Sequence, residues 1–169
     1  MKSLEGPRRI PWKPHGGRWF HWSAVEKCFW PGPGKRSVDV DDELAAIRFS
    51  GGLYLLACET RAPRETVPTV ATIKYIGETG SFKRRMEQFG NSAGFFGAQR
   101  NGHSAGWRWP PRGSGRLWIC FVPIGADLPK HLASGLRLWA EAQTLELYRA
   151  RHGSLPEVNA LLPDLGIGA

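Results

Sequence analysis

Three short apolar runs along the chain predict β-strands. The runs Gly52–Cys58, Val70–Gly77 and Leu117–Val122 are rich in β-branched and aromatic residues, as is typical of strands. The segment 59–69, between the first two runs, holds two prolines and two arginines. It predicts a hairpin loop that is longer than usual.

Polar caps and the helical spacing of apolar residues predict three helices, at about 41–48, 81–89 and 129–152. The first begins at Asp41 or Asp42, and the second is capped by Thr79 or Ser81. The Gly-rich segment 91–115 has no clear periodicity, so it predicts a long loop.

The order of these elements predicts a small α+β fold, with an antiparallel β-sheet flanked by helices. We expect the domain to cover residues 51–160, after an arm and short helix at 1–50 and before an irregular tail at 161–169. The arm is basic and rich in Trp, Pro and Gly. Its tryptophans either stack on bases or dock the arm onto the domain, and the burial of such large rings favours docking.

The net charge of +8 is unevenly distributed. Residues 1–37 carry eight Lys/Arg against two acids, and residues 83–116 carry seven against one. Two separate basic blocks predict a polyanionic partner such as nucleic acid. A solvated basic face that keeps the protein soluble would give the same charge, so both interpretations stay open.

Other features of the sequence narrow the class of protein. The longest apolar stretch, Leu53–Cys58, is too short to span a bilayer, and residues 1–13 lack the apolar core of a signal peptide. The cysteines are odd in number and widely spaced, which predicts neither a disulfide framework nor a metal knuckle. We therefore expect a reduced, cytoplasmic protein with no membrane association.

Two tyrosines are the first candidates for chemistry. Tyr54 lies in the first predicted strand and Tyr75 in the second, each close to a glycine. Strand side chains alternate between the two faces, so Ile73, Tyr75 and Gly77 are expected to share a face. Antiparallel pairing would then bring the two tyrosines together. A single strand tyrosine is usually a packing residue.

Arg85 is the second candidate. The predicted helix at 81–89 carries an apolar stripe of Phe82, Met86 and Phe89, and Arg85 lies on the same stripe. A guanidinium directed toward the sheet needs an anionic partner. That partner is either a phosphate, which suits the planar fork of donors, or an acid of the chain such as Glu78.

Glu141 is the third candidate. Leu138, Glu141, Leu145 and Tyr148 follow helical spacing, so a carboxylate interrupts a face that is otherwise apolar. Such a carboxylate is neutral, paired or bound to a cation if it is buried, whereas most glutamates are half-exposed. One carboxylate with water and substrate phosphate is a typical ligand set for Mg²⁺.

The combined pattern resembles the GIY-YIG nuclease domain. Its components are Gly52-Leu53-Tyr54, Tyr75-Ile76-Gly77, Arg85, Glu141 and Asn159. The resemblance covers about residues 51–160. It implies a compact domain with a small antiparallel sheet that cuts DNA phosphodiesters with one divalent metal ion, Mg²⁺ or Mn²⁺.

The resemblance also implies roles by position. Tyr54 corresponds to the proposed general base, and Tyr75 to the tyrosine that helps to place the water and the phosphate. Arg85 would bind the scissile phosphate, and Glu141 would hold the metal. Asn159 resembles the asparagine that supports the site.

Two features depart from the family's pattern. The interval between the two tyrosine motifs is longer, and Phe89 stands four residues after the arginine, where many members have His or Tyr. Phe89 can neither donate nor accept a proton. His103, in the following segment, could substitute for that residue, but a single histidine in a loop is more often inert.

Several side chains around these residues are candidates for nucleic-acid contacts. They belong to the second predicted helix or to the segment 99–116, which has no acids and contains Trp107-Arg108-Trp109. The candidates are Lys83, Arg84, Arg100, His103, Arg108 and Arg112.

Three functions remain open from the sequence. The leading hypothesis is a metal-dependent DNA endonuclease, for which cutting both strands from one site per chain would favour a homodimer. The alternative is a catalytically inactive GIY-YIG-like nucleic-acid-binding module, which the phenylalanine at position 89 favours. The third is a protein-binding domain whose tryptophan-rich arm docks a partner.

Overall fold

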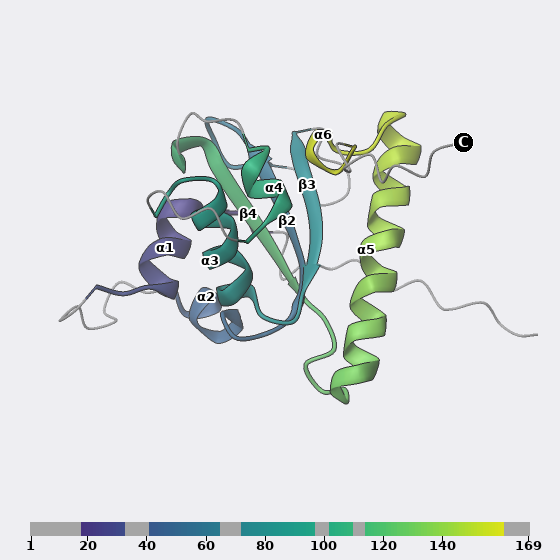
Figure 1. Cartoon of the computed structure of the whole chain (residues 1–169), viewed down its shortest axis with the longest axis horizontal. Coiled ribbons are helices and arrows are strands. Elements are labelled where there is room, and N and C mark those ends of the chain that lie inside the picture. Colours follow the sequence, from purple (N-terminus) through teal and green to yellow (C-terminus); the bar gives the residue numbers. More distant parts are fainter. Residues whose placement is uncertain (1–17, 33–40, 65–71, 97–101, 110–113, 161–169) are drawn as a thin grey trace, which may run out of the picture.

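A computed structural model describes residues 18–32, 41–64, 72–96, 102–109 and 114–160. The predicted α+β class is confirmed (Figure 1). The tail predicted at 161–169 lies outside the described residues. The elements in chain order are β1 (Phe20–His21), α1 (Trp22–Phe29), α2 (Asp42–Ile47), β2 (Gly52–Cys58), β3 (Ile73–Thr79), α3 (Phe82–Ser92), α4 (Ser104–Trp107), a 3₁₀ turn (Ser114–Arg116), β4 (Leu117–Pro123), α5 (Lys130–His152) and α6 (Glu157–Ala160).

The sheet is antiparallel throughout, with the strand order β1-β4-β2-β3. The three predicted strands are its main members, and β2 lies between β4 and β3. The register pairs Tyr54 with Gly77 and Leu56 with Tyr75. The two tyrosines therefore lie on neighbouring strands, one diagonal step apart.

Side-chain caps explain where the shorter helices begin. The Asp41 carboxylate accepts hydrogen bonds from the backbone N–H groups of Glu43 and Leu44, and the Ser81 hydroxyl accepts one from Arg84. These bonds satisfy donors that have no partner within the first turn of a helix. The predicted starts of both helices are confirmed.

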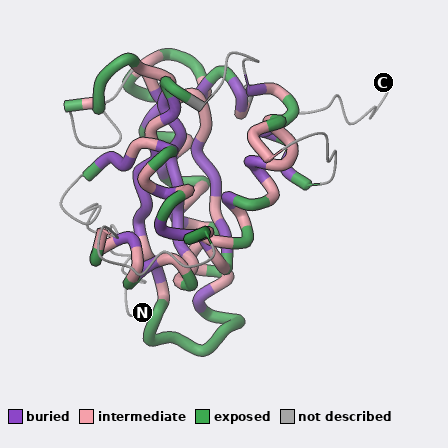
Figure 2. Tube along the Cα trace, turned by 90° about the vertical axis from the view of Figure 1, so that its left-hand side faces the viewer, coloured by how far each residue is buried: buried purple, intermediate pink, exposed green. Residues whose placement is uncertain are grey.

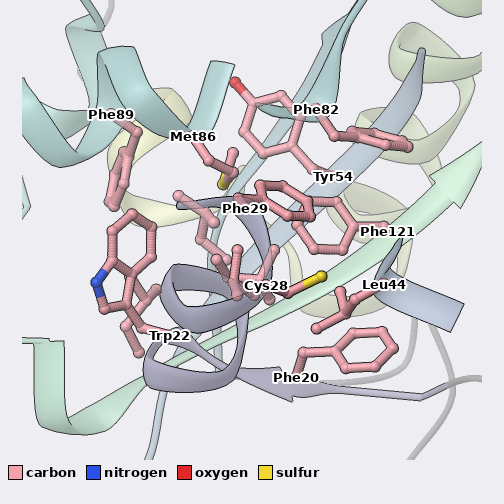
Figure 3. Close-up of a cluster of buried hydrophobic side chains, with 14 of the residues drawn as sticks. Phe20, Trp22, Cys28, Phe29, Leu44, Tyr54, Phe82, Met86, Phe89 and Phe121 are labelled. Atoms are coloured by element: carbon pink, nitrogen blue, oxygen red, sulfur yellow. The ribbon is translucent and has the colours of Figure 1, made fainter. Parts of the chain in front are cut away.

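The sheet separates two apolar clusters, and helices cover both of its faces (Figure 1). Helices α1 to α3 pack on one face, where the core is rich in aromatic rings (Figure 3). Helix α5 packs on the other, against aliphatic residues of the strands. Burial along the chain is concentrated in the strands, and exposed residues lie in the loops and on the outer sides of the helices (Figure 2).

The N-terminal segment belongs to the same packing unit as the rest. Residues 20–21 pair with β4 as the edge strand β1, and Trp19 and Trp22 are buried in the two clusters. Phe29 of α1 also stacks near Phe121 of β4, with ring centroids 5.8 Å apart. The division expected at residue 50 therefore does not correspond to a gap in the packing. In the described part of the arm, the tryptophans dock onto the domain.

A β-bulge corrects one expectation about the faces of β3. The pairing of β2 with β3 shifts register between Leu56 and Ala57, so Lys74 is the extra residue between the pairs. A bulge of this kind reverses the side-chain alternation beyond it. Ile73 therefore lies in the cluster under α5, on the opposite face from Tyr75.

The buried face of α5 also differs from the expected one. Leu138 is 55% exposed, while Ala133, Ala140, Thr144 and Tyr148 are buried. Small residues face the sheet because they let the helix backbone come close to it. Glu141 directly follows Ala140 and is therefore on the flank of the buried face, next to β3.

Within the described ranges, no helix is both long and apolar enough to cross a membrane.

Candidate functional site

The two tyrosines meet on the aromatic face of the sheet, as predicted. Their ring centroids lie 5.8 Å apart, and Tyr54 is 1% exposed whereas Tyr75 is half-buried. The Tyr54 hydroxyl points away from the rings of Phe29 and Phe121 (Figure 3). A Cβ added at Gly77 would lie only 2.7 Å from this hydroxyl. The glycine is therefore required because the Tyr54 side chain lies directly over its Cα.

His103 is brought onto this pair from a distant part of the chain. Its Nε2 lies 2.5 Å from the Tyr54 hydroxyl, and its ring meets both tyrosine rings edge-on. Sequence reasoning gave His103 as a nucleic-acid contact, as a substitute for the residue at position 89, or as inert. The structure places it in the interior, 2% exposed, in the same cluster as the tyrosines.

Helix packing and a cap fix the position of His103. The Ser92 hydroxyl accepts a hydrogen bond from the His103 backbone N–H at 2.7 Å, which ties the segment to the end of α3. Gly106 allows the close approach of α4, because an added Cβ would lie 2.8 Å from the Phe89 carbonyl oxygen. Phe89 itself packs edge-on against the imidazole, with centroids 5.7 Å apart. Phe89, which cannot exchange a proton, therefore helps to hold His103, which can.

The second ring nitrogen determines the tautomer of His103. Its Nδ1 accepts a hydrogen bond from the Ala105 backbone N–H at 3.0 Å, as the cap of α4. Nε2 therefore carries the proton and donates to the Tyr54 oxygen. Burial, together with the charge of Arg85, lowers the pKa of His103 to about 3. The imidazole is thus a neutral hydrogen-bond donor at ordinary pH.

Burial also raises the pKa of both tyrosines. For Tyr54 the rise is large, and a hydrogen bond donated to Tyr75 adds to it. The same bond lowers the pKa of Tyr75, which accepts it. His103 therefore donates to Tyr54, and Tyr75 is the more exposed of the two tyrosine rings.

Arg85 reaches the same cluster from α3. Its positive charge lowers the pKa of Tyr54, Tyr75 and Glu141, so the guanidinium lies within electrostatic reach of all three. No ion pair of Arg85 is found among the described residues, and its Nε is buried without a hydrogen-bond partner. A partly buried guanidinium left in this way has donors available for an anion.

Glu78 pairs with another arginine, so it is not the acidic partner that the sequence offered for Arg85. The carboxylate of Glu78 accepts a hydrogen bond from Arg137 Nε of α5 at 3.3 Å. The backbone N–H of Glu78 donates to the Glu141 carboxylate. Burial, with a further contribution from the negative charge of Glu78, raises the pKa of Glu141. Helix α5 thus places a carboxylate with a raised pKa beside Arg85.

The Asn159 side chain forms hydrogen bonds with the backbone of β3. Its side-chain oxygen accepts from the Ile76 N–H at 2.8 Å, and its amide donates to the Ile76 carbonyl at 2.8 Å. Ile76 stands between Tyr75 and Gly77, at the edge of the sheet. Asn159 therefore completes the hydrogen bonding of the edge strand that carries the second motif.

The predicted nucleic-acid contacts fall into different places. Arg84 is exposed and Lys83 half-buried on α3, while Arg108 donates a hydrogen bond to the Val158 carbonyl. Among the neighbouring tryptophans, Trp107 is 56% exposed and Trp109 is buried. The two remaining candidates, Arg100 and Arg112, lie outside the described residues.

Comparison with known protein families, curated proteins and solved structures found no match for this chain. The chemistry of the site therefore rests on its side chains. In the part of the chain that the structure describes, no three His, Cys, Asp or Glu side chains are grouped closely enough to hold a metal ion together.

The residues present still fit a hard divalent cation. Mg²⁺ is often held by one or two carboxylates, with water and substrate phosphate as its other ligands. Glu141 is such a carboxylate, and burial raises its pKa. Glu141 would hold the cation, and Arg85, which has no ion pair among the described residues, would face the phosphate.

Sequence reasoning predicted four of the clustered side chains from the motifs, and it raised His103 as a substitute for the residue at position 89 without fixing its position. Tyr54, Tyr75, Arg85 and Glu141 follow from motif spacing. His103 lies forty-nine residues beyond Tyr54, in a segment without periodicity, and only the packing of α4 on α3 brings the two together. The signal that the sequence did contain is the small residues of α4, since Gly106 allows its close contact with α3.

Proposed function

We propose that this protein is a metal-dependent DNA endonuclease that hydrolyses phosphodiester bonds through a site of the GIY-YIG type. One observation carries the proposal: an arginine without an acidic partner among the described residues lies within electrostatic reach of two tyrosines and a carboxylate. These are the groups that phosphodiester hydrolysis needs, namely a proton acceptor, a cationic clamp and an acid that can hold a metal.

Arg85 would bind the scissile phosphate with its free donors and stabilise the negative charge that develops on the phosphoryl oxygens. Tyr54 would take the proton of the attacking water. Because burial raises its pKa, Tyr54 is protonated in the resting protein. It therefore has to pass its own proton to the hydroxyl of Tyr75, which is nearer to solvent and would release its own proton to solvent in the same relay.

His103 would assist this transfer without changing its own protonation state. Its Nε2–H donates to the Tyr54 oxygen, where negative charge develops as the proton leaves. Its other nitrogen is occupied by the cap of α4, so His103 acts as a donor and not as the base. A bound Mg²⁺ or Mn²⁺ at Glu141 would supply positive charge, which lowers the pKa of bound water and offsets charge on the phosphate.

Cleavage of supercoiled plasmid, with and without Mg²⁺ or Mn²⁺, tests the proposal. We expect nicking or linearisation only with metal, and loss of cleavage in Glu141→Ala and Tyr54→Phe. Glu146→Ala is the matched control, because Glu146 is an exposed acid on the same helix that pairs with Arg149. Cleavage that survives both site substitutions would refute the assignment.

The second candidate is a nucleic-acid-binding module without catalysis. The observation that favours it is the resting state of the site, in which the base candidate is 1% exposed and protonated. Such a module would retard DNA on a gel in a salt-sensitive way and leave the plasmid intact under every metal condition.

A further inference from the structure

An exposed aromatic ring with two cations lies at the N-terminal end of α3, away from the site described above. Phe49, in the turn between α2 and β2, is 65% exposed. The Arg48 guanidinium carbon lies 4.6 Å from the centroid of its ring, and the Lys83 ammonium lies 5.7 Å from it. We call these three residues the Phe49 patch.

The turn that carries the patch is held firmly. The Lys83 N–H donates to the Arg48 carbonyl at 2.8 Å, and the Phe82 N–H donates to the Ser50 carbonyl at 2.9 Å. The Ser50 N–H in turn donates to the Ile47 carbonyl at 2.8 Å. These bonds flank Phe49 on both sides. The ring therefore cannot be buried by a simple shift of the turn, because that shift would break the start of α3.

The charge of the patch is not neutralised within the described residues. The neighbouring acids Asp41 and Glu43 both pair with Arg18, and no ion pair of Arg48 or Lys83 is found. Contact with the ring also limits the motion of the two cations, which reduces the entropy lost when they bind an anion. The patch thus offers two positioned cations and an apolar surface.

We propose that Arg48, Phe49 and Lys83 form a second DNA-binding surface, which contacts the DNA backbone away from the scissile phosphate; this inference rests on the proposed function. Phosphate binds cations, and an exposed aromatic ring can pack on a sugar or a base, so nucleic acid satisfies both parts of the patch. Lys83 and Arg85 are two residues apart on α3, which is about 3 Å along the helix axis but about 200° around it. A strand held at Arg85 therefore reaches the patch by passing around the first turn of α3.

The test is the affinity for a short fluorescent DNA duplex, measured by polarisation over a series of salt concentrations. The protein is the full chain with Glu141→Gln, so that no cleavage occurs. We expect Arg48→Ala and Lys83→Ala each to reduce the slope of log affinity against log salt by about one. Phe49→Ala should weaken binding about 5-fold or more with a smaller change in slope.

Arg151→Ala is the control, because Arg151 is an exposed arginine on the last turn of α5. It should bind as the parent does. Thermal melts confirm that each variant folds, which we expect because Phe49 is mostly exposed.

The outcomes separate this inference from the proposed function. If the wild-type chain cuts DNA and the patch variants keep the parent affinity and salt slope, the patch is not a DNA surface and the nuclease assignment stands. If binding falls in the patch variants but the wild-type chain never cuts, the surface is real and the nuclease assignment is wrong. DNA binding without salt dependence would overturn the patch proposal, because contacts of cations with phosphate release counterions and make binding salt-sensitive.

Discussion

An arginine lies on each side of the edge strand β3, one from α5 and one from α3. The first is paired with an acid, and the second is not paired with any acid of the described residues. On the α5 side, Arg137 pairs with Glu78 at 3.3 Å, and its side chain is only 11% exposed. On the α3 side, Arg85 has no acidic partner among the described residues and a buried Nε without a hydrogen bond. A paired, buried cation serves the fold, whereas one with open donors indicates a ligand. If the proposed function is right, the phosphate should therefore bind on the α3 side.

The largest effect that tests this comparison is expected at Arg85. Arg85→Ala should reduce plasmid cleavage about 10³-fold or more, because an arginine that stabilises phosphoryl charge contributes on this scale. The substitution removes no ion pair found in the described residues, so thermal stability should change little. Initial cleavage rates, together with a thermal melt, measure both quantities.

Arg85→Lys sharpens the same test. Lysine keeps the charge but lacks the planar fork of donors, so cleavage should recover only in part. A strong loss of stability in Arg85→Ala, with cleavage retained, would show that Arg85 serves the fold in the way that Arg137 does.

The next effect concerns His103, which lies on the α3 side with Arg85. Replacing it with alanine removes the donor to Tyr54, and we expect cleavage to fall about 10²-fold, as on loss of one donor to a developing charge. Because the pKa of His103 is lowered to about 3, its charge does not change between pH 5 and 8. The pH–rate profile of the wild-type chain should therefore contain no limb that comes from this residue.

Asn is a useful second substitution at position 103, since its side chain can also cap α4. If the wild-type profile has an acidic limb near pH 6 that His103→Asn abolishes, His103 titrates in that range. The neutral-donor assignment would then be wrong.

Much of the fold was predictable because it depends on local patterns. The apolar runs predicted β2, β3 and β4, and caps at Asp41 and Ser81 predicted the starts of two helices. The edge strand β1 was not predicted, since two residues carry no pattern of their own and their pairing depends on β4. The arm therefore belongs to the sheet in a way that its composition does not show.

The candidate site was predictable only where it lies on these patterned elements. Arg85 follows from the stripe of α3, but the availability of its guanidinium depends on Glu78, which a helix far along the chain engages. The face of α5 was predicted correctly at Tyr148 but not at its other buried positions, because these are alanine and threonine and lack the large apolar side chains of the expected pattern. Long-range pairing of charges and packing of small residues have no local signature in a sequence.

On the α5 side, Arg137→Gln should mainly affect stability. It leaves the Glu78 carboxylate, with 23% of its side chain exposed, without its ion pair. We expect a loss of about 1 to 3 kcal/mol in the free energy of unfolding, measured by urea denaturation. Arg149→Gln is the control, because Arg149 forms an exposed pair with Glu146 on the same helix. Equal effects of the two substitutions would contradict a structural role for the Arg137 pair.

The smallest effect is expected for Glu141→Gln without metal. This substitution should increase the free energy of unfolding at pH 7. Burial raises the pKa of Glu141, so the folded protein holds its proton more tightly than the unfolded chain does. Stability is therefore lost as the pH rises from the ordinary carboxyl range through the raised pKa. Glutamine cannot ionise, so the variant should be more stable than the wild type at pH 7, by about 1 kcal/mol or less because solvent screens this partly exposed group.

The difference between the two proteins should shrink as the pH is lowered toward 4, where Glu141 is protonated. Mg²⁺ should raise the melting temperature of the wild type and leave that of the variant unchanged, since binding to the folded state stabilises it. Glu146→Gln, which changes an exposed acid, should show neither effect. A Gln variant that is less stable at pH 7 would mean that the Glu141 carboxylate is already compensated by the protein. In that case Glu141 would need no metal ion to balance its charge, and Arg85 would be the one unbalanced group of the candidate site among the described residues.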